Sequence, residues 1–466
     1  MNVYINLPVE DREAVDGFME TALAHGGDEL QQPQDYGFMY ARTLGDLDGH
    51  IWEPSRLDLE AALAAGAPTR PAPAARAWSG ARLRSVRAVS LILIAGLSGC
   101  ADFPGQSDTV RVDPEPLVEI GELEGAEEYL FSSIGQAFLL GDGRLVVSDR
   151  GVNEIRVFGP DGTFINTIGR VGEGPGEYGD VTGLWLTPDG LIGVWDGGNL
   201  RVSTFRVDGE LVGASRLRVD EAAEYSVTPE VLFGSFANGD ILLASLEFGG
   251  PPDTPEAIPD RWVLARFGPD GEPRGALGDL RGMRRLRGQP IPFTPLPRVT
   301  ILGDSLFAAD GYEAAIDVRG PAGVVGRTIA LPAVDRSEDA DAAWSELEAE
   351  LRARDRGMYL GMLERLPRSD EFPEIGGLLA DGRGLLWVKV YEIPDDALWL
   401  GLGAAVHPGA GGEWRLVRPD GGDGEVQATV RLPDGLTPLH VTGDRLVGIQ
   451  RDALDVERIV VHAVER

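Results

Sequence analysis

Three aspartates and two asparagines recur at related places in this chain of 466 residues and could bind a cation. Asp149, Asp196 and Asp310 each follow a short apolar run, and Asn153 and Asn199 come a few residues after the first two. Carboxylate and amide oxygens are ligands for hard divalent cations. The same groups also accept backbone N–H hydrogen bonds and fix a chain reversal. Because every repeated strand pair needs that reversal, the sequence favours a structural role over a metal-binding role.

Residue types that other catalytic mechanisms need are scarce. Only His407, His440 and His462 follow residue 100, and Lys389 is the sole lysine. There is no GxSxG, HExxH or GxxxxGK[ST] motif, so serine hydrolysis, zinc peptidase chemistry and P-loop phosphate binding have no candidate residues. The sequence therefore favours a protein without catalysis of its own and predicts no cofactor, with a divalent metal as the open alternative.

The overall charge disfavours a nucleic-acid partner. The chain has 42 Lys and Arg against 75 Asp and Glu, which gives 42 − 75 = −33 at pH 7. Binding to a phosphate backbone depends on clustered cations, and no segregated basic patch is evident in the folded region. The 63 glycines and 32 prolines favour many tight turns and short strands over long helices.

A turn dipeptide between two short apolar runs recurs six times after residue 136, and such dipeptides are typical of β-hairpins. Their first residues are 47, 49, 65, 78 and 62 positions apart, a spacing typical of four-stranded propeller blades with insertions. A second hairpin turn, such as Pro160-Asp161-Gly162, follows in most units. We therefore predict a mainly β fold, a six-bladed β-propeller over residues 117–466. The six pairs are Asp142-Gly143, Asp189-Gly190, Asn238-Gly239, Gly303-Asp304, Asp381-Gly382 and Gly443-Asp444.

The last unit contains only three of its four strands. Its final apolar run, Ile459–Val464, ends just before Arg466, whereas Leu117–Gly121 precedes the first unit and has no partner there. We expect Leu117–Gly121 to complete the last blade, because pairing the two ends in one sheet removes exposed strand edges.

The segments 149–158 and 196–205 can be superposed with a one-residue offset after the aspartate, and more loosely with 310–319. Their pattern resembles the NHL repeat, D-x-x-N-x-R-[IV]-x-x-F. The run 169–178, Gly-Arg-Val-Gly-Glu-Gly-Pro-Gly-Glu-Tyr, resembles an inter-blade loop of NHL-like propellers from bacterial envelopes. The resemblance implies six blades and an envelope protein.

A change of composition marks the boundary before the propeller. No acidic residue occurs between Ala61 and Ala101. Residues 61–81 read as a Pro/Ala/Arg linker, and 82–99 combine arginines with a short apolar run, which is typical of a secretory signal and too short for a membrane-spanning helix.

The end of this signal, Leu97-Ser98-Gly99-Cys100, resembles the lipobox of bacterial lipoproteins. The resemblance implies cleavage after Gly99, a lipid on Cys100, a membrane as partner and a location in the bacterial cell envelope. Residues 100–116 would then be a tether. If the internal signal is not used, the chain stays in the cytoplasm.

Residues 1–60 read as a small α+β unit. A strand at Val3–Val9, a helix at Arg12–His25 and two later strands give the order βαββ, with a possible extra strand near Leu30. The sequence from Asp46 to Glu53, DLDGHIWE, resembles the last module of the glyoxalase/bleomycin-resistance (vicinal oxygen chelate) family. The resemblance implies that Glu53 is a metal ligand of a truncated βαβββ module, although one carboxylate does not make a metal site.

Three insertions are the candidate binding loops, because propellers carry function on loops at the channel mouth. They are 248–260, 336–366 and 391–414, the second of which we expect to be an amphipathic helix. Their aromatic and histidine residues either contact a ligand or anchor the loop, and anchoring is the commoner role; these residues are Trp344, Trp399, His407 and Trp414.

The predicted function is a lipid-anchored envelope scaffold that binds a protein, peptide or glycan. Two alternatives stay open. One is a metal-dependent propeller enzyme of lactonase or sugar-dehydrogenase type, which would need Glu, Asn and Asp side chains from several blades around one cation. The other is a cytoplasmic glyoxalase-like metal protein that acts through residues 1–60.

Overall fold

The computed structural model describes two compact units, one within Met1–Phe103 and one within Pro104–Arg466. No helix in the described ranges is long and apolar enough to cross a membrane. The described residues are 4–8, 12–24, 26, 28–35, 39–45, 51–57, 110–219, 229–250, 256–333, 340–353, 360, 367–368, 372–392, 409–420, 424–452 and 456–466.

The first unit is a four-stranded sheet with one helix. Its elements are β1 (Tyr4–Pro8), α1 (Arg12–Ala24), β2 (Asp28–Asp35), β3 (Met39–Gly45) and β4 (Ile51–Leu57), in the sheet order β1-β4-β3-β2. The extra strand expected near Leu30 is thus the full strand β2, and the unit is βαβββ. Helix α1 buries Val15 and Met19, two positions four residues apart that share one helix face.

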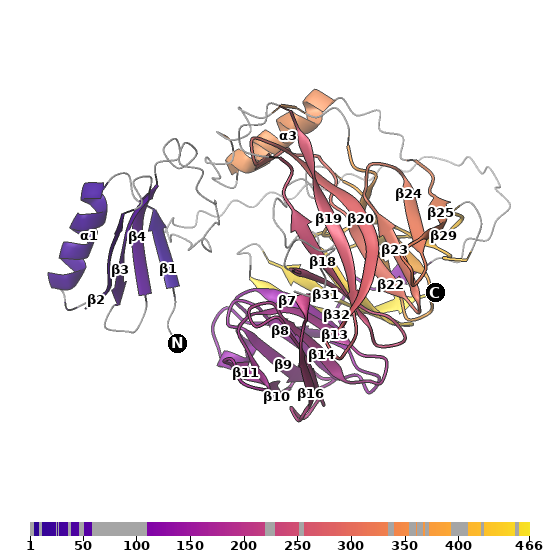
Figure 1. Cartoon of the computed structure of the whole chain (residues 1–466), viewed down its shortest axis with the longest axis horizontal. Helices are drawn as coiled ribbons and strands as arrows, with labels where there is room; N and C mark the ends of the chain where they lie inside the picture. Colours follow the sequence, from indigo (N-terminus) through magenta and orange to yellow (C-terminus); the bar gives the residue numbers. More distant parts are fainter. Residues whose placement is uncertain are drawn as a thin grey trace, which may run out of the picture. The chain divides into compact units, whose positions relative to one another are not determined.

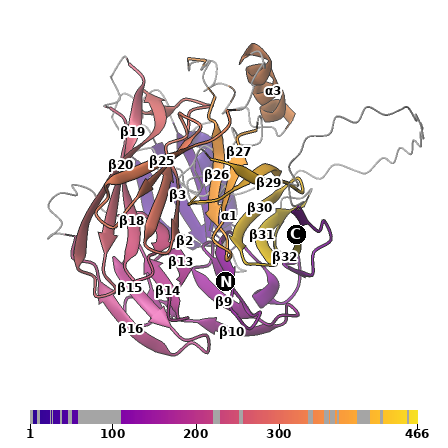
Figure 2. The same ribbon diagram turned by 90° about the vertical axis from the view of Figure 1, so that its right-hand side faces the viewer.

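The second unit is a six-bladed β-propeller, as predicted (Figures 1 and 2). Its blades are antiparallel sheets of four or five strands. The first three blades are β7 (Ile134–Leu139), β8 (Leu145–Asp149), β9 (Glu154–Phe158), β10 (Phe164–Ile168); β13 (Val181–Leu186), β14 (Ile192–Asp196), β15 (Arg201–Phe205), β16 (Leu211–Arg216); and β17 (Val231–Ser235), β18 (Ile241–Glu247), β19 (Ile258–Phe267), β20 (Pro273–Leu286), β21 (Gln289–Pro290).

The remaining blades follow the same plan. They are β22 (Arg298–Leu302), β23 (Ser305–Ala309), β24 (Ala315–Arg319), β25 (Val325–Ala330); β26 (Ile375–Ala380), β27 (Leu386–Val390), β28 (Gly412–Val417), β29 (Val426–Leu432); and β30 (Leu436–Val441), β31 (Arg445–Arg451), β32 (Glu457–Glu465) with β5 (Arg111–Val112) and β6 (Val118–Ile120). Outside the blades are η1 (Glu127–Tyr129), the parallel pair β11 (Arg170–Val171) and β12 (Glu177–Tyr178), and α3 (Ala340–Ala353).

All six turn dipeptides lie between the first and second strands of a blade, as the sequence predicted. Gly143, Gly190 and Gly239 have φ of 86°, 81° and 85°. An L-residue with a β-carbon adopts this left-handed backbone only at a cost, so glycine fits the turn.

The first and last strands of the propeller unit meet in the sixth blade, which confirms the predicted closure. β6 pairs antiparallel with β32, with Val118 opposite Val461, and Figure 1 shows β31 of the sixth blade beside β7 of the first. One predicted boundary is too late, because β5 lies inside the stretch 100–116 expected to be a tether, yet Val112 pairs with Val464. A two-residue strand has too few positions to give a periodic pattern.

Apolar side chains fill the spaces between neighbouring blades. One cluster joins Phe138 and Val146 of the first blade to Leu184 and Val194 of the second, and other clusters bridge successive blades in the same way. Each blade is therefore apolar on both faces, which is why its second strand reads as a continuous apolar run.

All three long insertions and the extended part of β19–β20 emerge at one end of the propeller, here called the loop face. In an antiparallel blade the second-to-third-strand loop and the connection to the next blade share one end, and the two hairpin turns share the other. Figures 1 and 2 show α3 and the tip of β19–β20 together at that end.

Candidate functional site

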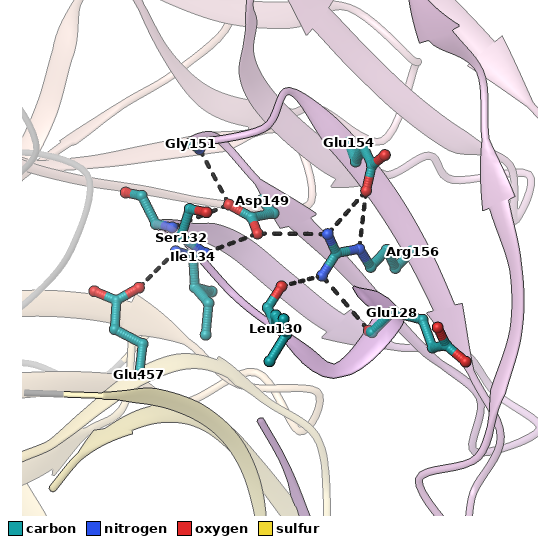
Figure 3. Close-up of polar contacts among 10 residues, drawn as sticks. Glu128, Leu130, Ser132, Ile134, Asp149, Gly151, Glu154, Arg156 and Glu457 are labelled. Atoms are coloured by element: carbon teal, nitrogen blue, oxygen red, sulfur yellow. Dashed lines mark hydrogen bonds and ion pairs between the residues drawn. The ribbon is translucent and has the colours of Figure 1, made fainter. Parts of the chain in front are cut away.

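The Asp149 carboxylate is occupied by backbone N–H groups (Figure 3). Ser132 and Ser133 donate to Oδ2 and Oδ1 at 2.9 and 3.0 Å, and Gly151 donates to Oδ1 at 3.1 Å. The residue is fully buried. Asp149 thus ties the end of β8 to the chain just before β7, which is the structural role that the sequence favoured.

Arg156 covers this carboxylate from the neighbouring strand. Its guanidinium lies 3.7 Å from Asp149, pairs with Glu154 at 2.8 Å and donates to the Leu130 carbonyl at 2.6 Å (Figure 3). Its side chain is 5% exposed. Buried polar groups that are all hydrogen-bonded hold a local structure firmly, so Arg156 supports the blade and does not face a ligand.

Asp196 makes the same contacts one blade later. Gly179 and Asp180, just before β13, donate to its two oxygens at 3.0 and 2.9 Å, and the Asn199 N–H donates at 3.1 Å. The Asn199 side chain also donates to Asp196 Oδ2 at 2.7 Å. The two aspartates are therefore equivalent positions of a structural repeat.

Asn153 and Asn199 are not equivalent, although both follow an aspartate of the pattern. Asn153 has φ of 58°, and the residue with the matching conformation in the second blade is Leu200, at 49°. The Asn153 amide accepts from Val181 N–H at 2.6 Å and donates to the Gly179 carbonyl at 3.1 Å. Asn153 thus links the first blade to the chain that enters the second, whereas Asn199 holds its own turn and donates to the Gly172 carbonyl of the preceding inter-blade loop at 3.1 Å.

Asp310 has a different role again. It lies one residue after β23, and its Oδ2 accepts two hydrogen-bond-length contacts from the Arg281 guanidinium at 2.7 and 2.8 Å. Arg281 belongs to β20 of the preceding blade. Asp310 Oδ1 also accepts the Tyr312 N–H of its own turn at 3.2 Å. The five predicted turn or ligand residues therefore do not converge: all of them hold turns or blade junctions, and Asp310 in addition holds an ion pair.

The aromatic candidates on the insertions are buried where the structure describes them. Trp344 of α3 is 1% exposed and packs edge-on against Phe293, with ring centroids 5.0 Å apart. Trp414 in β28 is fully buried and donates to the Gly411 carbonyl at 3.0 Å. Both rings anchor their insertions. Trp399 and His407 lie outside the described residues.

Trp344 belongs to a small apolar cluster of the loop face that is separate from the blade cores. Its members are Phe293, Trp344, Leu347, Leu351 and Tyr391, with Leu360 and Phe372 packed against it. The helix expected within 336–366 is described over Ala340–Ala353, and Trp344, Leu347 and Leu351 are its members of this cluster. The cluster fixes α3 to the loop before β22 and to the end of β27.

Sequence reasoning missed an arginine-rich stretch on the loop face. Between Asp279 and Asp304 there are five arginines and no acidic residue. Arg285 pairs with the buried Asp260 at 2.8 Å and stacks 4.6 Å from the ring centroid of Phe248, which is 61% exposed. Burial raises the pKa of the Asp260 carboxyl, and the Arg285 pair opposes that shift. The closely spaced arginines of this stretch, in a strongly acidic chain, were the sequence signal that could have revealed it.

Beside these arginines lies Tyr312. The Arg281 guanidinium stacks 4.5 Å from the Tyr312 ring centroid, and the Tyr312 hydroxyl donates to the Gly282 carbonyl at 2.9 Å. Burial raises the pKa of the Tyr312 phenol to about 12, so this group stays neutral and donates its proton at neutral pH. The contact fixes the extended end of β20 on the fourth blade.

Among the described residues, no three His, Cys, Asp or Glu side chains gather as a metal site. The Glu53 backbone lies in β4 opposite Asn6 of the parallel strand β1, but its side chain is outside the described set. Gly99 and Cys100 also lie outside it. The lipid, signal and Glu53 metal-ligand predictions therefore stay predictions.

Comparison with known proteins gives the same fold. The sequence profile of a family described as "6-bladed beta-propeller" matches residues 118–233, which span the first two blades and the start of the third. No curated protein matches the sequence.

Solved structures similar to this chain share little sequence with it. A DUF4221-family protein from Bacteroides vulgatus has 11% identity and a TM-score of 0.44, covering 78% of this chain and 100% of its own. The PQQ-bound aldose sugar dehydrogenase of Streptomyces coelicolor has 13% and 0.39, covering 77% and 98%. A gluconolactonase from Xanthomonas campestris has 14% and 0.35, covering 72% and 88%.

Proposed function

We propose that this protein is a binding propeller of the bacterial cell envelope, whose loop face holds a protein, peptide or glycan ligand and which has no catalysis of its own. The observation that carries the proposal is the placement of the insertions. They come from the third blade, from the connection between the fourth and fifth blades, and from the fifth blade, and all emerge at the same end of the ring. Propellers use rigid blades to position variable loops, so this end is the one elaborated for contact.

The loop face is anchored well enough to act as a binding surface. The Trp344 cluster fixes α3. The Asp310–Arg281 and Asp260–Arg285 pairs fix the extended part of β19–β20 in the third blade. A surface held in one conformation loses less entropy when a ligand binds. By contrast, the hairpin turns at the opposite end are shorter: apart from the connection between β28 and β29, each has two to five residues between its strands.

The envelope location rests on the lipobox-like sequence before Cys100. Several acyl chains at one terminus anchor a protein stably, because each buried methylene contributes about 0.8 kcal/mol. Mass spectrometry of the protein from its host tests this part of the proposal. We expect a lipid-modified Cys100 and no peptides from residues 1–83. Abundant upstream peptides with a free Cys100 thiol would contradict the lipoprotein proposal and favour a cytoplasmic protein in which the βαβββ unit is retained.

Photo-crosslinking in the host tests the binding face. A benzophenone amino acid replaces Phe248 or Glu313 on the loop face, and Asp189 or Asp208 in exposed hairpin turns at the opposite end serves as the matched control. We expect discrete adducts only from the first pair. Adducts from both ends alike, or only from the control end, would contradict the proposal.

A further inference from the structure

The arginine hairpin of the third blade, formed by the end of β20 and β21, is the part of the loop face with the most specific chemistry. Five arginines occur between Asp279 and Asp304, a stretch without acidic residues in a chain of net charge −33. Three of these arginines already have partners within the protein. Arg281 pairs with Asp310, and Arg285 pairs with Asp260. Arg298 is buried at the start of β22 and makes contacts of its own.

Two arginines of the hairpin have no such partner. Among the interactions of the described residues, neither Arg284 nor Arg287 forms an ion pair, although both lie next to committed arginines. Arg287 is exposed and Arg284 is half-buried. No described carboxylate of the chain neutralises these two guanidiniums, which are three positions apart on the hairpin, so both are available to a ligand.

The turn that carries Arg287 has a costly conformation. Leu286 pairs with Gln289, and the two residues between them, Arg287 and Gly288, have φ of 51° and 77°. Such two-residue turns favour Asn-Gly or Asp-Gly because a left-handed backbone strains most other side chains. Strained residues of this kind concentrate at functional sites, and an arginine at this position places its guanidinium at the tip.

The surroundings keep the tip rigid. The Arg285 guanidinium donates to the Gly288 carbonyl at 3.2 Å while it stacks on Phe248. The Arg284 N–H donates to the Thr294 hydroxyl at 3.2 Å, and the Arg284 carbonyl accepts from Ile291 N–H at 2.9 Å. Arg285 therefore connects the charged turn to the exposed Phe248 ring, and the two form one surface.

We propose that Arg284, Arg287 and the Phe248 ring form a recognition site for a short acidic segment of polypeptide. The guanidinium forks bind carboxylates in a bidentate manner, and an apolar side chain of the same segment covers Phe248. A long polyanion fits less well, because only two cations of this hairpin lack a partner among the described residues, and the charges beyond them would face an acidic protein. The inference deepens the proposed binding function and rests on it.

A binding assay with the full chain tests the site. The probe is a short fluorescein-labelled peptide that contains alternating aspartates and one phenylalanine, and its anisotropy is measured at low salt. Arg287→Asn removes the charge with a residue that tolerates the left-handed turn, and Arg284→Gln removes the second charge. We expect the double variant to bind at least about tenfold more weakly, because hydrogen bonds between charged groups contribute that much or more.

Two further variants separate charge from geometry and location. Arg287→Lys keeps the charge but loses the fork, and we expect an intermediate loss. Arg206→Gln removes an exposed arginine from a hairpin turn at the opposite end, and we expect no loss. Unchanged melting temperatures show that the variants are folded.

Three results would overturn the inference. The first is that the unmodified protein does not bind the peptide, and the second is that the double variant binds it equally well. The third is that polygalacturonate displaces the peptide, binds more tightly than it does, and loses affinity in the double variant, which would make the ligand a polyanionic glycan. The crosslinking experiment at Glu313 tests the binding function independently, so a failure at the arginine hairpin is distinguishable from a failure of the loop face.

Discussion

Glu457 in the last strand of the chain accepts a hydrogen bond from the backbone N–H of Ile134 in the first inner strand, at 2.6 Å (Figure 3). The two residues are 323 positions apart. The same carboxylate also pairs with Arg451. The contact joins the sixth blade to the first, beside the place where β6 completes the sixth blade. One ion-paired carboxylate thus fastens the ring at its junction.

Glu457→Gln should therefore lower the stability of the whole propeller. The amide keeps one acceptor but loses the charge, and hydrogen bonds to charged groups contribute about 1.5–3 kcal/mol. We expect a loss of about 1–2 kcal/mol in the free energy of unfolding, measured by urea denaturation. Glu425→Gln, on an exposed position, is the matched control and should change it by less than about 0.5 kcal/mol. Equal effects of the two variants would contradict the closure role.

Asp149 and Asp310 should differ in the same assay. Asp149→Asn replaces a buried carboxylate that accepts three backbone N–H groups with an amide that has one acceptor oxygen, so at least one donor is left unsatisfied. We expect a loss of about 2–3 kcal/mol. Asp310→Asn weakens a partly exposed ion pair and leaves an acceptor for the single backbone N–H, that of Tyr312, which Asp310 binds, so it should cost about 1 kcal/mol or less. A larger loss at Asp310 would show that the repeat aspartates do not hold the blades.

The number of blades was predictable from the sequence because each hairpin turn has its own local signature. Four of the six dipeptides contain a glycine with a left-handed backbone, and a dipeptide satisfies this requirement wherever the strands go. The pairing of Leu117–Gly121 with the last blade was also predictable, since one segment lacked a partner and one blade lacked a strand. The two-residue β5 was not, because its register depends on Val464 at the far end of the chain.

The roles of the site residues were less predictable, because they depend on contacts between blades. The sequence aligned Asn153 with Asn199, whereas the backbone makes Asn153 equivalent to Leu200. Nothing local distinguishes an asparagine that contacts the inter-blade loop before its own blade, as Asn199 does, from one that reaches the start of the next blade, as Asn153 does. The arginine hairpin shows the same limit, since the residues that neutralise Arg281 and Arg285 are 29 and 25 positions away.

His440 should make the propeller less stable in mild acid. It lies in β30, and its Nδ1 accepts the Leu139 N–H at 3.3 Å. Burial lowers the pKa of His440 to about 4, below the value of about 6.5 for an unfolded chain. Between these values the unfolded chain binds a proton that the folded chain does not, so stability falls as the pH drops from about 6.5 to about 4 and is fully present above 6.5.

Replacing this histidine should reduce the pH dependence. His440→Gln keeps an acceptor for the Leu139 N–H but does not titrate. We expect the slope of unfolding free energy against pH in this window to be smaller by up to about 1.4 kcal/mol per pH unit, the value for one proton. Urea denaturation at pH 7, 6, 5 and 4 measures it. Parallel curves for the two proteins would mean that His440 is already protonated in the folded state.

Trp344 and Trp387 are both buried, yet their removal should have different consequences. Trp387 lies in β27 among the blade cores and donates to Asp381 at 3.1 Å, so Trp387→Ala should destabilise the whole propeller by about 3–5 kcal/mol. Trp344 belongs to the separate cluster that fixes α3. Trp344→Ala should therefore release the helix while the ring stays folded, because local units open with their own free energies.

Limited proteolysis should cut the Trp344→Ala protein within 336–366 at a higher rate than the unmodified protein, and the melting temperatures of the two proteins should be close. A large fall in melting temperature without faster cleavage there would show that α3 is part of the propeller core and not an anchored element of the loop face.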